Sequence, residues 1–119
     1  MITRKSDVRM DVIGFGGVRI LSVLSQLSKK YQMDIMITSG TDGVHSGPLD
    51  PHKLGNAYDI KTHDMPSRQF KDAIVRELNN LLSDKFYAFL EDPDLPNEHI
   101  HIQVAKGKQF TIEDLFNTL

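Results

Sequence analysis

The sequence predicts one small α+β domain in which helices cover one face of an antiparallel sheet. The predicted order of elements is helix, strand, loop, strand, helix, strand, strand, helix, and a short turn at 92–97 joins the last two strands. Strands joined by so short a connection pair antiparallel, and helices packed on one face leave the other face open. With 119 residues the chain has room for one hydrophobic core, so we expect a single domain over residues 1–119.

Three helices are predicted, at 17–31, 66–83 and 111–119. Apolar residues recur at helical spacing in the first two. Pro66 suits the first turn of the second helix. The third opens with Thr111 and has an aspartate three residues later, which is a capping pattern. The first helix places four side chains on one face: Ile20, Leu24, Leu27 and Tyr31.

Four strands are predicted, at 33–38, 56–62, 85–91 and 99–104. Apolar and polar side chains alternate in the first and last of them, as in strands with one buried face. The polar segment at 39–55 separates the first two strands and is rich in glycine and proline. A connection of that length without secondary structure is uncommon in a compact domain and usually signals function or disorder. We therefore expect a site beside this segment.

Strand periodicity gathers polar side chains on the open face. In 99–104 the three aliphatic residues should face the helices, which sends His99, His101 and Gln103 to the other side. The same alternation in 56–62 buries Tyr58 and Ile60 and places Asp59 on the open face. His52 precedes Asp59 at the end of the polar segment, where the chain can fold back over the strand.

His52, Asp59 and His101 offer two imidazoles and a carboxylate. This set suits a zinc ion (Zn2+) that keeps one coordination position for water, although it does not exclude other divalent metals. Glu98 lies three residues before His101, where it could accept a proton from a metal-bound water. The alternative is that these histidines are solvated and bind nothing. From the residues alone both interpretations remain open.

Two short motifs resemble those of a known family. "HKLGNAYD" at 52–59 matches the His, Gly, Ala and Asp positions of the motif in zinc D-Ala-D-Ala carboxypeptidases and L-alanyl-D-glutamate endopeptidases, which include phage endolysins. These enzymes share a fold with the zinc domain of Hedgehog proteins. "EHIH" at 98–101 is similar to their second motif, in which a catalytic acid precedes a ligand histidine. "ITSG" at 37–40 resembles the strand before their substrate loop, so the resemblance spans about residues 33–104.

The resemblance implies that His52, Asp59 and His101 are zinc ligands and that Glu98 is the general base. The implied activity is that of a metallopeptidase, a hydrolase that degrades the cell wall by cleaving an amide bond in peptidoglycan stem peptides. His99 should face the same side as His101, where it can steady an oxyanion or orient a neighbour. The alternative is a non-catalytic, zinc-stabilised binding module of the same fold.

One departure from the family's sequence pattern leaves the identity of the substrate undetermined. Relatives often continue "SGYRS", with an arginine that binds the substrate carboxylate, whereas this chain has "SGTDG" and Asp42 cannot replace that arginine. Lys53 and Lys61 are candidate replacements, but lysine lacks the bidentate fork of arginine. For His45 and His63 a solvated surface role is favoured. The bond cleaved, and whether the enzyme is a carboxypeptidase or an endopeptidase, stay open.

The composition of the chain limits the classes of partner and of chemistry that we expect. A net charge of -2 gives no attraction to nucleic acid, and the absence of cysteine excludes thiolate chemistry. Asp11 and Arg19 interrupt the apolar patch near the N-terminus, so we expect neither a signal peptide nor membrane insertion.

"GFGGVR" at 14–19 lacks the glycine spacing of a phosphate loop and is interpreted as a helix entry. We expect a peptidoglycan or muropeptide substrate, cytoplasmic synthesis and, for a phage enzyme, release to the cell wall. The sequence indicates no oligomeric state.

Overall fold

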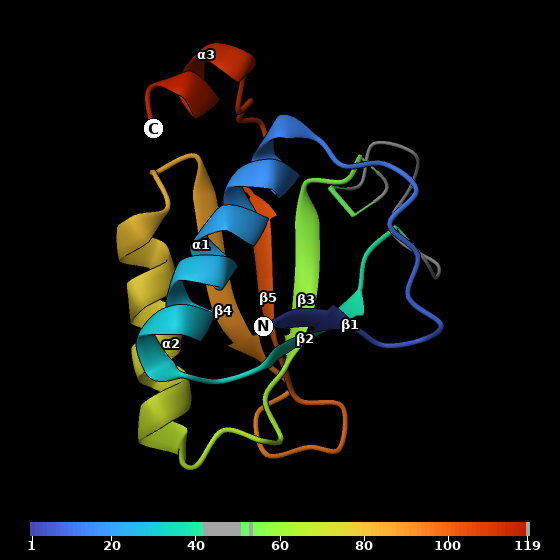
Figure 1. Ribbon diagram of the computed structural model, residues 1–119, viewed down its shortest axis with the longest axis vertical. Helices are drawn as coiled ribbons and strands as arrows, with labels where there is room; N and C mark the ends of the chain where they lie inside the picture. The colour runs from blue at the N-terminus through green and yellow to red at the C-terminus, as the bar shows by residue number, and fades with distance from the viewer. Residues whose placement is uncertain (42–50, 53, 119) are drawn as a thin grey trace.

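The computed structural model of the chain describes residues 1–41, 51–52 and 54–118 (Figure 1). It is a small α+β domain with a mixed sheet of five strands and three helices. The elements follow the chain in the order β1 (Ile2–Arg4), α1 (Phe15–Tyr31), β2 (Ile35–Ser39), β3 (Ala57–Lys61), α2 (Arg68–Leu81), β4 (Phe86–Glu91), β5 (His99–Val104) and α3 (Ile112–Phe116).

The strand order in the sheet is β1-β2-β3-β5-β4. The three pairings that link β2, β3, β5 and β4 are antiparallel, as predicted, but β1 pairs parallel with β2. The prediction of a wholly antiparallel sheet is therefore wrong at this edge. β1 escapes sequence analysis because its three residues are too few to show an alternating pattern.

Local chemistry sets the helix ends. α1 begins at Phe15, two residues before the predicted start, and Gln32 ends it in the left-handed conformation with a φ of 50°. α2 begins at Arg68 rather than at Pro66, because the Ser67 hydroxyl accepts a hydrogen bond from the backbone N–H of Phe70 and so caps the helix. The capping pattern predicted for α3 is confirmed, although the helix ends at Phe116.

The core lies between the sheet and the helices α1 and α2, which cover one face of it (Figure 1). The alternation predicted for β3 and β5 is confirmed, because the side chains expected to face the helices are fully buried. Burial of one such aliphatic side chain contributes about 1.5 to 3 kcal/mol to folding. Among the described residues, no helix is long and apolar enough to span a membrane. The fully buried side chains of β3 and β5 are Ala57, Tyr58, Ile60, Ile100 and Ile102, and of these Ala57 was expected on the open face.

A side chain of α2 protects the outer edge of the sheet. β4 is an edge strand, and the backbone N–H and C=O of Ala88 point away from β5. The Asn79 amide oxygen accepts from the Ala88 N–H at 2.9 Å, and the Asn79 amide nitrogen donates to the Ala88 carbonyl, also at 2.9 Å. Asn79 thus occupies the positions that a neighbouring strand would use, which protects the edge from further pairing.

We predict that Asn79→Ala destabilises the fold relative to Asn80→Ala. Both substitutions remove an exposed asparagine from the same helix and gain the same helix propensity, but only the first leaves Ala88 without its two hydrogen bonds. The difference in the free energy of unfolding should be about 1 to 2 kcal/mol, measured by urea titration. Equal stabilities of the two variants would contradict this role.

Candidate metal centre

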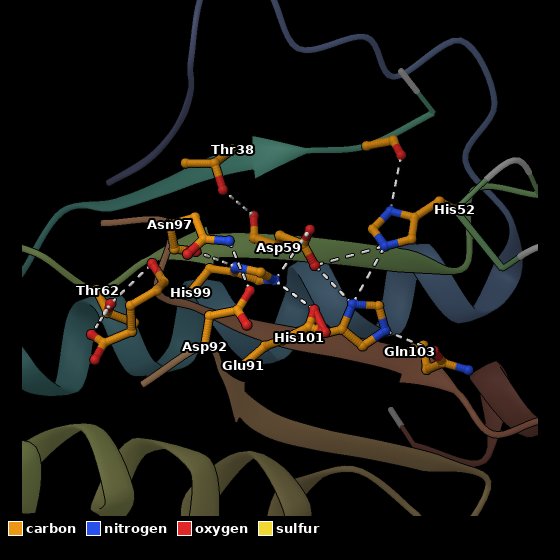
Figure 2. Close-up of polar contacts among 12 residues, drawn as sticks. Thr38, His52, Asp59, Thr62, Glu91, Asp92, Asn97, His99, His101 and Gln103 are labelled. Atoms are coloured by element: carbon orange, nitrogen blue, oxygen red, sulfur yellow. Dashed lines mark hydrogen bonds and ion pairs between the residues drawn. The ribbon is translucent and has the colours of Figure 1, made fainter. Parts of the chain in front are cut away.

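Two of the predicted ligands lie opposite each other on the central strands of the sheet. Asp59 of β3 pairs with His101 of β5 in the antiparallel register, and both side chains project from the face that α1 and α2 leave uncovered (Figure 2). Residues in such a pair are within reach of a direct contact. The His101 Nδ1 atom lies 2.8 Å from the Asp59 Oδ1 atom.

The third predicted ligand, His52, comes from a turn that packs against the start of α1. The Gly55 N–H donates to the His52 carbonyl at 3.1 Å, and the Asn56 side chain accepts from the Gly17 N–H at 3.3 Å. Gly55 has a φ of 70°, and a Cβ there would lie 2.2 Å from the Val12 carbonyl oxygen. The glycine of "HKLG" is therefore required both for conformation and for space.

Hydrogen bonds fix which nitrogen of each imidazole carries a proton. His52 Nδ1 lies 3.0 Å from the Gly40 carbonyl oxygen, which only accepts, so Nδ1 carries the proton and Nε2 presents a lone pair. His101 Nε2 lies 2.6 Å from the amide oxygen of Gln103. The Gln103 nitrogen donates to the Val104 carbonyl, which fixes the orientation of that amide. His101 Nδ1 is therefore the lone-pair nitrogen of the neutral ring.

Three acceptor atoms consequently face one another. His52 Nε2 lies 3.4 Å from His101 Nδ1 and 3.7 Å from Asp59 Oδ1, and the remaining side of the triangle is the 2.8 Å contact between Asp59 and His101. Acceptors this close repel one another unless a proton or a metal ion lies between them. Ligands about 2.0 to 2.2 Å from a tetrahedral zinc ion are about 3.3 to 3.6 Å apart. The two sides that meet at His52, 3.4 Å and 3.7 Å, are close to this range, whereas the 2.8 Å contact between Asp59 and His101 has the length of a hydrogen bond and must widen when zinc binds.

Burial strengthens this argument. The exposed fraction is 5% for His52 and 9% for His101, and that of the Asp59 side chain is 16%, so both imidazoles are largely shielded from water. Burial alone would lower the pKa of His101, but the hydrogen bonds to Asp59 and Gln103 outweigh it and raise the pKa above its usual value. Without metal, a proton is therefore favoured where the ion would bind. The residues fit a divalent ion such as zinc, whose binding would release that proton.

His99 lies beside this centre, as the strand pattern predicts. Its Nδ1 donates to the Asn97 carbonyl oxygen at 2.7 Å, and its Nε2 lies 3.0 Å from a Glu91 carboxylate oxygen and 3.7 Å from the second carboxylate oxygen of Asp59 (Figure 2). The ring donates to both sides only when it carries two protons. Sequence analysis did not identify Glu91, although the alternation of 85–91 places it on this face.

Glu98 does not join the cluster. Its carboxylate accepts hydrogen bonds from the Asp94 N–H at 2.7 Å, the Lys71 ammonium and the Thr62 hydroxyl. These bonds, above all the one from the Asp94 backbone, lower the pKa of Glu98 to about 2. A spacing of three residues along a strand turns Glu98 and His101 to opposite faces, which explains why its partner Lys71 belongs to α2. Its role as a general base stays a prediction.

Two aromatic side chains complete the surroundings of His101. Tyr87 and Phe89 of β4 stack with ring centroids 5.9 Å apart, and the Phe89 ring lies 5.4 Å from that of His101. Sequence analysis missed them, although the alternation of β4 places both on the face of His101. About two fifths of each aromatic residue is exposed, so they form an apolar border of the site.

The remaining candidates form no hydrogen bond or ion pair with the three ligands within the described part of the chain, or they lie outside it. His63 is exposed, and Lys61 forms an ion pair with Asp64 at 3.3 Å. The expectations for Asp42, His45 and Lys53 fall on residues that the structure does not describe.

Comparison of the chain with models of known protein families, with curated proteins and with solved structures found no match. The function of the chain is therefore inferred from its sequence motifs and from the geometry of the described residues.

We predict that Gln103→Leu weakens zinc binding about 10- to 100-fold, because His101 loses the acceptor that orients its ring. Gln103→Glu, which keeps an acceptor at this position, should bind zinc at least as tightly as the parent. Competition with a chromogenic chelator measures both affinities, and circular dichroism checks the fold. Unchanged affinity in Gln103→Leu would show that the amide does not orient the ligand.

We also predict that Glu98 contributes a pH-dependent part of the stability. Because its pKa is lowered from 4.5 to about 2 by folding, its contribution is complete above pH 4.5 and is lost as the pH falls towards 2. Glu98→Gln should therefore lose about 2 to 3 kcal/mol at neutral pH and less in acid. Glu113→Gln, the same change at an exposed position, is the control. A Glu98→Gln deficit that does not shrink on acidification would contradict the assignment.

Proposed function

We propose that this protein is a zinc-dependent hydrolase that cleaves an amide bond in peptidoglycan stem peptides. The observation that carries the proposal is that one ring nitrogen of His52, one ring nitrogen of His101 and one carboxylate oxygen of Asp59 all lie within 4.8 Å of one another. The similarity of "HKLGNAYD" and "EHIH" to the motifs of zinc peptidases supports the substrate class.

The chain supplies three ligands, and a tetrahedral zinc site with three protein ligands keeps one position for water or substrate. A bound zinc ion supplies Lewis acidity towards a carbonyl oxygen and towards water. Asp59 and His101 are held opposite each other by the pairing of two sheet strands, so a small side-chain movement that widens their 2.8 Å contact is enough to admit the ion. Tyr87 and Phe89 offer an apolar surface to the ligand on the β4 side.

Proton transfer requires a base near the metal. Under this proposal the base is Glu98. Its carboxylate must first release at least one of its three hydrogen-bond donors and turn towards the ligand face. The pair of His99 and Glu91 is the second candidate, because it lies on the ligand face beside Asp59.

One observation favours the second function, a non-catalytic metal-stabilised binding module. The Glu98 carboxylate is satisfied by Lys71, Thr62 and the Asp94 backbone, and a pKa of about 2 makes it a weak base near neutral pH. A binding module would use the same metal ligands for stability and would need no base.

We predict that the purified chain holds about one zinc ion and that the zinc-loaded form releases new amines from peptidoglycan. His101→Ala should lose both zinc and cleavage, because it removes a ligand. Elemental analysis measures the metal. Mass spectrometry of products from several wall types, and from L-Ala-D-Glu and D-Ala-D-Ala peptides, identifies the bond. A folded parent that retains no zinc refutes the site, whereas a zinc-loaded parent that cuts none of these substrates favours the binding module.

Glu98→Gln should keep zinc but lose cleavage about a hundredfold to ten-thousandfold, because glutamine cannot accept the proton. Lys71→Met is the matched control, since it breaks the same ion pair and keeps the carboxylate. Equal losses in both variants would assign the effect to packing. Full cleavage by Glu98→Gln would move the base elsewhere, with the pair of His99 and Glu91 next.

A further inference from the structure

The glycine-rich sequence "GFGGVR" forms the start of α1, as predicted, and lies against the turn that carries His52. The Gly14 N–H donates to the Gly55 carbonyl at 3.0 Å. A Cβ atom at Gly14 would lie 2.1 Å from the Asn56 side-chain oxygen, and one at Gly17 would lie 2.1 Å from the Gly55 carbonyl oxygen. The glycines therefore let α1 approach the turn more closely than other residues would allow. We call this turn the His52 turn and define it by its described residues Pro51, His52, Leu54, Gly55 and Asn56.

Asn56 of the His52 turn supplies the cap that α1 lacks in its own sequence. Gly14 occupies the N-cap position and offers no side chain, and the first turn of α1 contains no acidic residue. The Asn56 side-chain oxygen accepts instead from the Gly17 N–H at 3.3 Å, which is one of the bonds that an N-cap side chain makes. The Asn56 carbonyl also accepts from the Val104 N–H at 3.0 Å. One residue thus joins α1, the turn and the end of β5.

The chain before α1 supports the other contact of His52. His52 Nδ1 donates to the Gly40 carbonyl at 3.0 Å. The next residue, Thr41, donates its N–H to the Arg9 carbonyl at 2.8 Å, and its hydroxyl accepts from the Asp11 N–H at 3.1 Å. The loop before α1 and the start of α1 therefore lie beside both supports of His52, the Gly40 carbonyl and the turn (Figure 1).

His52 is the ligand that the sheet does not place. Asp59 and His101 are opposite residues of two paired strands, whereas His52 belongs to a turn. A turn opens locally at a lower free-energy cost than a pair of central strands. Among the described contacts, those with Gly40 and with the start of α1 therefore set the position of His52 Nε2, which lies 3.7 Å from Asp59 Oδ1.

We propose that Asn56 is a positioning residue of the metal centre, because it links the first turn of α1 to the position of His52. The effect on the metal rests on the proposed function, whereas the link between α1 and the turn rests on the hydrogen bonds of the chain alone. Coupling between two sites is reciprocal, so zinc bound at His52 should also stabilise the start of α1.

Amide hydrogen exchange on chelator-treated protein tests the link between α1 and the His52 turn. Asn56→Ala should speed exchange at Gly14 and Gly55, whose N–H groups bond within this contact, about tenfold more than Ser67→Ala does. Ser67→Ala is the matched control, because it removes the acceptor that caps α2 and leaves the turn intact. Asn56→Asp, which keeps an oxygen acceptor, should restore slow exchange. Equal exchange at these two amides in Asn56→Ala and Ser67→Ala would overturn the proposal.

Zinc affinity, measured by competition with a chromogenic chelator, tests the effect on the metal. Asn56→Ala should bind zinc about tenfold more weakly than the parent, whereas Ser67→Ala should bind it equally and Asn56→Asp at least as tightly. In a His52→Ala background, Asn56→Ala should have no further effect, because the remaining ligands belong to the sheet. Zinc should also slow exchange at Gly17 in the parent.

The two measurements separate failure of the proposal from failure of the metal centre. A parent that binds zinc no more tightly than Asn56→Ala does would overturn the positioning role. A parent that binds no zinc at all would refute the metal centre and with it this role, and the exchange result would then decide the link between α1 and the turn.

Discussion

The meeting of His52 Nε2, His101 Nδ1 and Asp59 Oδ1 is the constraint on which the rest of the account depends. Acceptor atoms at these distances repel one another unless a proton or a cation lies between them. The β3 and β5 pairing fixes two of them, and a glycine-dependent turn against α1 fixes the third. Two strands and a turn thus position three acceptor atoms beside one another. A bound cation is the simplest explanation of this arrangement.

The two faces of the sheet divide stability from chemistry. One face is covered by α1 and α2 and supplies the apolar core, and the other carries the metal ligands and the aromatic border formed by Tyr87 and Phe89. Glu98 lies where the two meet, at the entry to β5. Its bonds to Lys71 and Thr62 tie that strand end to α2 and β3, which holds His99 and His101 in register.

Much of this arrangement could be predicted from the sequence, because strand alternation is a local property. It placed Asp59, His99, His101 and Gln103 on one face, and the structure confirms that grouping. The parallel strand β1 could not be predicted, since three residues carry no periodic signal. The partners of Glu98 were missed because Lys71 and the Asp94 backbone meet it only in the folded chain. The same holds for Gly55, whose need for space depends on the distant Val12 carbonyl.

The central claim is that a metal ion binds through Nε2 of His52 and Nδ1 of His101, a different nitrogen of each ring. Nitrogen-15 spectra of the imidazoles, recorded during zinc titration of chelator-treated protein, test it most directly. The account predicts that zinc shifts those two nitrogens to the range of metal-bound imidazole, while the protonated nitrogens that face Gly40 and Gln103 keep their hydrogens. Zinc that leaves both rings unchanged, or that binds His63 instead, would contradict it.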